Sequence, residues 1–362
     1  MPLTAPILAP LAATVLLSTG GFAPRPDLDS GRYLKVLAES SAQLAQDPRN
    51  ALALAAKSQA LSALMRFGEA AALAQQSLDL NPELADAFLA RGLSRAGSAV
   101  QQRSFGSLRQ ISGAMDDLRS ATERDPSLQT AWMTLGIAYQ QLPGLLGGST
   151  RKALTCADAL ARLAPARGAA LRGSILALDG KWWDADAAFQ KALGLAPADP
   201  QVVLGYLEGL AEKSARKALG LEAQRSRLAA EARRLAPALR SSGRGMEAVC
   251  EALLEAGQAE EAWGQAEAAV RSVDAPSLLR LKLGKIAARS GLHRREGVAF
   301  LDQVLKEPLE GGSGGYPTVH WRRGQILRDL GQVTEARQAA RSALAIDPRH
   351  PGARKLLEEL DQ

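Results

Sequence analysis

The chain has 362 residues, of which 46% are hydrophobic and 23% charged, so it can bury a large core and has the composition of an ordinary soluble protein. Its 44 Lys and Arg against 38 Asp and Glu give a net charge of +6, but this charge is spread along the chain, and only 4% of the residues are aromatic. So few aromatics exclude a stacking platform for single-stranded nucleic acid, and we expect no nucleic-acid partner.

Residues 1–27 are predicted to be an apolar leader and a linker. An uncharged apolar run, residues 7–18, is followed by small residues and a proline-rich stretch, as in the apolar region of a secretory signal. No Lys or Arg precedes the run and Pro10 interrupts it, so a start of another kind remains open. The run is too short to span a bilayer comfortably. We expect an exported, periplasmic protein of a bacterium, with a cytoplasmic location as the alternative.

Pairs of amphipathic helices joined by short turns recur along residues 28–361, and a proline closes most of the second helices. The fullest copy is 166–197, where small residues such as Gly173 and Ala185 permit close approach of the helices and Pro197 ends the second one. The predicted units lie near 30–48, 50–82, 85–126, 129–165, 166–197, 200–237, 243–274, 277–308 and 317–348, with a polar capping helix over 351–360.

Several units depart from this pattern. Unit 85–126 carries extra residues around 99–112, which should lengthen both helices or form a protruding loop. Unit 129–165 has an enlarged turn over 142–149, and unit 200–237 is recognisable mainly by its helical periodicity. A glycine-rich break over 310–316 precedes the last full unit.

The spacing of the small and bulky residues resembles the tetratricopeptide repeat, and the first closing prolines, Pro48 and Pro82, are separated by the 34 residues of that repeat. No segment alternates as a strand does. The resemblance implies an all-α, right-handed superhelical solenoid of helix-turn-helix repeats, whose concave wall is built by the first helix of each pair. Such proteins usually bind peptides on that wall.

The repeat positions at which the family usually binds peptides can be located in the first helices of this sequence. They give two groups of candidate partner-binding residues. The second and third units contribute an apolar patch, which usually marks a partner unless a loop or the N-terminal helix covers it. The last two units contribute arginines beside a tryptophan, which suit a carboxylate or an acidic peptide, with a solvated polar face as the alternative. The candidates are Leu89, Leu93, Met133, Ile137 and Gln140, and then Lys285, Arg289, Trp321, Gln325 and Arg328.

No constellation predicts catalysis, a cofactor or a metal site. Residues 311–315, Gly-Gly-Ser-Gly-Gly, match a nucleophile elbow in letters only, because no strand precedes them. Residues 147–149 lack the Gly-Lys-Ser/Thr of a phosphate-binding loop, and Ser149 or Thr150 more simply caps the next helix. The histidines are scattered and the cysteines lie far apart in predicted helices, so we expect buried free thiols.

The leading interpretation is a non-enzymatic scaffold that binds a protein or peptide partner in the concave groove. A narrower resemblance supports an alternative, because residues 142–149, followed by Lys152 and Ala153, are similar to the Pro-x-x-x-Gly-Gly turn of the periplasmic T-component proteins associated with tripartite solute transporters. It implies a periplasmic carrier of a small hydrophobic ligand, which would need a closed pocket beside Leu89 and Met133. An open groove lined by mixed polar groups would favour the scaffold. The oligomeric state stays open.

Overall fold

The computed structural model describes residues 22–29, 31–102, 107–273, 276–309 and 315–361. Within these ranges the chain forms twenty α-helices, two 3-10 turns and no strand, which confirms the all-α prediction. The helices are α1 (Arg25–Asp29), α2 (Tyr33–Gln46), α3 (Ala51–Ala63), α4 (Phe67–Leu80), α5 (Ala85–Gln102), α6 (Ser107–Arg124), α7 (Gln129–Gln141), α8 (Thr150–Leu163), α9 (Pro165–Leu178), α10 (Trp182–Leu195), α11 (Pro200–Ala211), α12 (Lys213–Leu219), α13 (Leu221–Leu235), α14 (Gly243–Glu255), α15 (Ala259–Ala269), α16 (Pro276–Ser290), α17 (Arg294–Val304), α18 (Gly315–Asp329), α19 (Val333–Ile346) and α20 (Pro351–Leu360).

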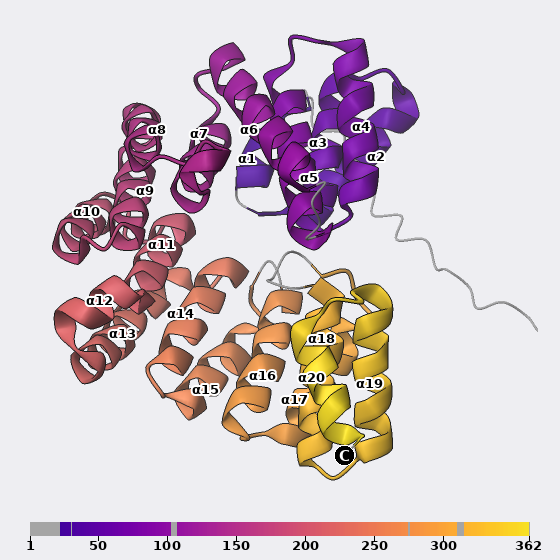
Figure 1. Ribbon diagram of the computed structural model, residues 1–362, viewed down its shortest axis with the longest axis vertical. Coiled ribbons are helices and arrows are strands. Elements are labelled where there is room, and N and C mark those ends of the chain that lie inside the picture. The colour runs from indigo at the N-terminus through magenta and orange to yellow at the C-terminus, as the bar shows by residue number, and fades with distance from the viewer. Residues whose placement is uncertain (1–21, 30, 103–106, 274–275, 310–314, 362) are drawn as a thin grey trace, which may run out of the picture.

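Successive helices pack as hairpins that stack into the predicted solenoid. The pairs α3–α4, α5–α6, α7–α8, α9–α10, α14–α15, α16–α17 and α18–α19 pack tightly, and α20 covers the end of the stack against α18 and α19. First helices also pack on one another, as α9 does on α11 and α14 on α16. The stack curves until its first helices, α1 to α6, face its last ones, α16 to α20, across the middle of the molecule (Figure 1).

The unit of α9 and α10 shows why this sequence makes close hairpins. Phe189 is fully buried, and a Cβ built on Gly173 of α9 would lie only 2.7 Å from its ring. Glycine therefore permits the two helices to approach around the phenyl group. Trp182 is 2% exposed in the core and its neighbour Trp183 is 63% exposed, so the first packs between helices and the second points outward.

The irregular units have physical counterparts. The extra residues around 99–112 extend α5 and α6 to 18 residues each, which is the first of the two predicted outcomes; residues 103–106 lie outside the described part. The enlarged turn contains the 3-10 turn η1 (Gly144–Leu146), and the Ser149 hydroxyl caps α8 by accepting from the Lys152 amide at 3.3 Å. Unit 200–237 has three helices, α11 to α13, instead of two.

The start of the described part of the chain, from residue 22, is packed into the solenoid. The predicted leader falls mainly on residues 1–21, outside the described residues, and so does the elbow-like sequence at 311–314. From residue 22 onward, however, the chain lies against the first units: α1 contacts α2 and α3, and Leu28 packs on the cluster of Val36 and Ala56. None of the described helices is both long enough and apolar enough to cross a bilayer.

Candidate functional site

The concave side of the solenoid surrounds a cavity of about 1300 Å³. Its lining comes from first helices throughout the chain, namely α3, α5, α7, α11, α14, α16 and α18, together with the α1–α2 segment and residues at and near the start of α20. Helices at opposite ends of the sequence share this lining because the stack curves back on itself (Figure 1). The cavity is therefore a product of the whole array.

Early and late units of the array contact each other directly. The Arg349 guanidinium donates a hydrogen bond to the Gln102 carbonyl at the end of α5. A Cβ on Gly315 would lie 2.8 Å from the Met65 sulfur, so the start of α18 touches the turn after α3. These contacts join the two ends of the superhelix around the cavity.

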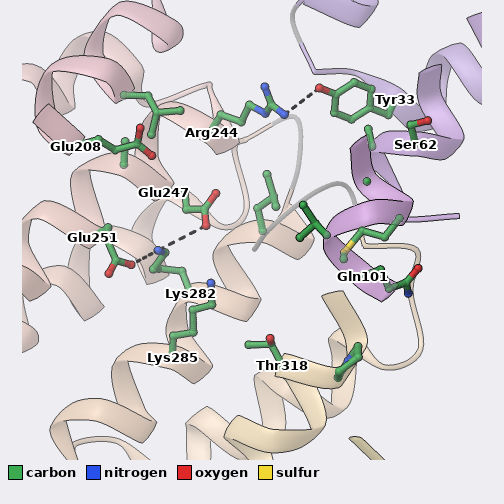
Figure 2. A pocket seen from close by; sticks show the side chains of 18 of the residues that line it. Tyr33, Ser62, Gln101, Glu208, Arg244, Glu247, Glu251, Lys282, Lys285 and Thr318 are labelled. Atoms are coloured by element: carbon green, nitrogen blue, oxygen red, sulfur yellow. Dashed lines mark hydrogen bonds and ion pairs between the residues drawn. The ribbon is translucent and has the colours of Figure 1, made fainter. Parts of the chain in front are cut away.

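Ion pairs between α14 and α16 form the floor of the cavity. Glu247, Glu251 and Glu255 are four residues apart, so they lie along one face of α14. From α16, the Lys282 ammonium pairs with Glu251 and lies 3.5 Å from Glu247, and Arg289 bonds Glu251 at 2.9 Å and Glu255 at 2.8 Å. Figure 2 shows the first two pairs and Lys285 beside them.

The charges at the centre of the floor are stabilised by one another. Burial acts to lower the pKa of Lys282, whose side chain is 3% exposed, but Glu247 and Glu251 outweigh it and raise the pKa. Burial likewise acts to raise the pKa of Glu251, and Lys282 and Arg289 lower it. Lys285, 8% exposed, has a lowered pKa because it is buried and close to Lys282. Lys282 and Glu251 are thus both ionised at neutral pH.

The two ends of the floor have opposite character. The pKa of Glu208 on α11 is raised, first by the surrounding protein, which removes solvent, and then by the nearby carboxylates of Glu247 and Glu212. Its side chain is nevertheless exposed on the cavity side. On α18, burial and Arg289 lower the pKa of Arg322 to about 10; its guanidinium lies 3.9 Å from the centre of the Trp321 ring. The floor is acidic towards α11 and basic towards α18.

The opposite wall is more apolar. It includes Leu93 and Val100 of α5 and Met133 of α7, and Val100 is 70% exposed. Thr130 and Thr134 lie between these side chains on α7. The cavity therefore offers a ligand both an apolar wall and a charged floor, as the groove of a peptide-binding protein does.

The structure brings together half of the sequence-predicted binding residues. Those that line the cavity are Leu93, Met133, Lys285, Arg289 and Trp321. Those that do not line it are Leu89, Ile137, Gln140, Gln325 and Arg328. Leu89 is 1% exposed and belongs to the core cluster of Met115 and Leu118. Gln325 accepts from Arg322 at 2.9 Å, and Arg328 pairs with Glu359 of the capping helix.

Sequence reasoning missed the acidic side of the floor. Glu247 and Glu251 lie on a first helix, but their partners Lys282 and Arg289 belong to the next unit, and only the packing of α14 on α16 pairs them. The four-residue spacing of glutamates in 247–255 was the signal in the sequence.

The described residues contain no group of His, Cys, Asp and Glu arranged to hold a metal ion. Both cysteines are buried free thiols, and burial raises the pKa of Cys156 to about 11 and that of Cys250 to about 12. A thiol with so high a pKa is a poor nucleophile.

The sequence matches no curated protein. Among solved structures, the chain is similar to yeast Tom70, with 13% sequence identity, coverage of 93% of this chain and 87% of Tom70, and a TM-score of 0.49. It is also similar to TTC0263, a thermophilic TPR protein of Thermus thermophilus, with 19% identity, coverage of 52% of this chain and 99% of TTC0263, and a TM-score of 0.44. A third similar structure is a chain of the APC/C hetero-tetramer Cut9–Hcn1, with 17% identity and a TM-score of 0.43. The match covers 92% of this chain but only 53% of that one, so this chain spans about half its length.

Residues 317–350, the hairpin of α18 and α19 with its closing turn, match the model of the tetratricopeptide repeat family. Helical hairpins of the same layout precede it along the described chain, and α20 closes the stack. Residues 317–350 therefore form one tetratricopeptide repeat, stacked on helical hairpins of the same layout.

Proposed function

We propose that the chain is a non-enzymatic scaffold that binds a flexible segment of a protein partner in its central cavity. The observation that carries this proposal is the cavity itself, whose volume of about 1300 Å³ exceeds the roughly 300–1,000 Å³ of most small-molecule pockets. Its lining mixes ion pairs, hydroxyl groups and apolar side chains along several helices. A peptide offers that mixture of groups over a comparable length.

The charge of the floor indicates how such a segment would be oriented. A basic side chain of the partner would lie near Glu208, where carboxylates crowd one another, and would relieve their repulsion. An acidic side chain would lie near Arg322, where burial and Arg289 disfavour the guanidinium charge. The preferred segment therefore carries both signs of charge, separated by the width of the floor.

The alternative, a periplasmic carrier of a small hydrophobic ligand, needs a closed apolar pocket. Of the apolar patch predicted for that ligand, only Leu93 and Met133 line the cavity, and threonines and charged groups share it. This lining supports the scaffold over the carrier. From the apolar run at residues 7–18 alone, we also propose that the protein is exported.

Selection of peptides from a random library on the purified chain tests the scaffold. Selected peptides should carry an acidic residue, and Arg322→Glu should weaken their binding at least about 10-fold, since a charge-assisted hydrogen bond contributes about 1.5–3 kcal/mol. Arg341→Glu is the matched control, because Arg341 is exposed on α19 away from the cavity and the charge change is the same.

Two results would contradict the proposal. If no peptide is selected, or if both arginine variants weaken binding equally, the cavity is not the peptide site. Native mass spectrometry of the gently purified protein addresses the carrier directly, since a lipid-sized added mass that Met133→Arg removes would favour the carrier instead.

A further inference from the structure

The start of the described chain occupies part of the concave face. We call residues 22–33 the N-terminal strap; residue 30 lies outside the described residues. The Arg25 guanidinium bonds both carboxylate oxygens of Asp86, at 3.0 and 2.6 Å, and lies 2.7 Å from a carboxylate oxygen of Asp125. One arginine of the strap thus sits between acidic residues of α5 and of the turn that follows α6.

Further along, the strap reaches three more units. The Thr130 hydroxyl of α7 donates to the Asp29 carboxylate at 2.6 Å, and Gln201 of α11 donates to the Asp29 carbonyl at 3.3 Å. The Arg244 guanidinium of α14 donates to the Tyr33 hydroxyl at 2.9 Å, as Figure 2 shows. The strap therefore crosses the concave face from α5 to α14, as a bound peptide would.

The acceptor for Arg25 is specific in its chemistry. Asp86 is 2% exposed, and a buried carboxylate is strongly destabilising unless a cation pairs with it. Arg25 satisfies both of its oxygens, and the guanidinium fork suits such two-point contact better than an ammonium does. Any segment that replaces the strap must therefore bring a cation, and arginine fits best.

The strap also has little internal structure and few apolar contacts to keep it in place. Its helix, α1, has five residues, too few to be stable in isolation. Its apolar contacts are limited to a small cluster in which Phe22, Leu28 and Tyr33 pack on Val36 and alanines of α3. Its polar contacts with α5, α7, α11 and α14 are ones that a peptide from another molecule could also make.

We propose that the face formed by α5, α7, α11 and α14 is a binding site for an arginine-containing peptide segment. The strap is its resident ligand, and a partner segment with Asp four residues after the Arg, as in Arg25 and Asp29, binds by displacing it. This goes beyond the scaffold proposed above, because it specifies a second position on the concave face and holds whether or not a peptide binds the charged floor.

Binding of a synthetic peptide to the full chain tests this site. The acceptor is the full chain with Arg25→Ala and Asp29→Ala, two changes that weaken the binding of its own strap. The probe is a fluorescent peptide of residues 22–33. It is titrated to about 1 mM, because tethered segments act at millimolar effective concentrations. The acceptor should bind the peptide at least about 10-fold more tightly than the natural chain does. Adding Asp86→Asn to the acceptor should remove that gain.

Controls separate the site from a general effect of charge. Asp116→Asn on the exposed face of α6 changes the same group elsewhere and should leave the binding unchanged. If Asp86→Asn does not fold, Asp125→Asn, on the more exposed partner of Arg25, takes its place. No binding to the acceptor at 1 mM, or equal loss with Asp116→Asn, would overturn the proposal.

Hydrogen exchange of the natural chain gives a second readout. Asp86→Asn should speed exchange of amides in residues 25–33 at least about 10-fold while leaving those of α16 to α20 unchanged. Unchanged exchange in the strap would show that Arg25 does not hold it and would also contradict the proposal.

Discussion

Gly173→Ala is expected to destabilise the chain, although alanine is the better helix former. Residue 173 lies in the middle of α9, and its added Cβ would be 2.7 Å from the Phe189 ring. The ring cannot move away, because on its other side a Cβ on Gly209 would already be 2.5 Å from it. Phe189 is held between two glycines, so the new methyl group must displace packed helices.

The sizes of two opposing effects decide whether Gly173→Ala raises or lowers the free energy of unfolding. Overpacking a well-packed core costs about 1–3 kcal/mol, and the ring's confinement on both sides favours the upper part of this range. The gain in helix propensity from Gly to Ala is about 1 kcal/mol. We therefore expect a net loss of about 2 kcal/mol. Gly264→Ala is the matched control, because Gly264 is exposed in the middle of α15 with no atom within 4 Å of its added Cβ, and it should stabilise by up to about 1 kcal/mol.

The assay is urea unfolding of both variants, with hydrogen exchange of α9 and α10 because repeat arrays can unfold unit by unit. Phe189→Leu should make room for the methyl group, so in that background Gly173→Ala should cost less, with a coupling energy of about 0.5–3 kcal/mol. Stabilisation by Gly173→Ala equal to that of Gly264→Ala, or a cost that Phe189→Leu leaves unchanged, would refute the packing argument.

Three further outcomes are expected. Lys282→Met should reduce the free energy of unfolding by about 1.5–3 kcal/mol, because it removes a charged hydrogen-bond donor from Glu251, which is partly exposed and keeps its pair with Arg289. An unchanged free energy in urea unfolding would contradict this. Glu208→Gln should raise the melting temperature at pH 7, because the raised pKa means that the folded state disfavours the charge. The gain should shrink as pH falls through the folded-state pKa and disappear well below about 4.3, the ordinary pKa of glutamate, where Glu208 is neutral in both states. A gain that persists there would have another cause. Cys156 and Cys250 should resist iodoacetamide at pH 8 in the folded protein and react in urea, as mass spectrometry can show; rapid native labelling would contradict the burial that raises the pKa of each thiol.

Patterns within single units of the sequence were enough to predict the local architecture. Closing prolines, glycine turns and small residues at fixed spacing act within one unit, so they predicted the hairpins. The cap at Ser149 and the lengthened α5 and α6 were predictable for the same reason.

How the units face one another could not be predicted from the sequence and is seen only in the folded array. Small rotations between successive units add up along the stack, and irregular ones such as α11 to α13 change the sum, so no local pattern records where the ends meet. That geometry places Leu93 on the cavity wall and Leu89 in the core, and it joins Lys282 to glutamates of the preceding unit. It also brings Arg25 to Asp86, a contact between residues 61 positions apart, because the curved stack sets the concave face of α5 directly in the path of the N-terminal strap.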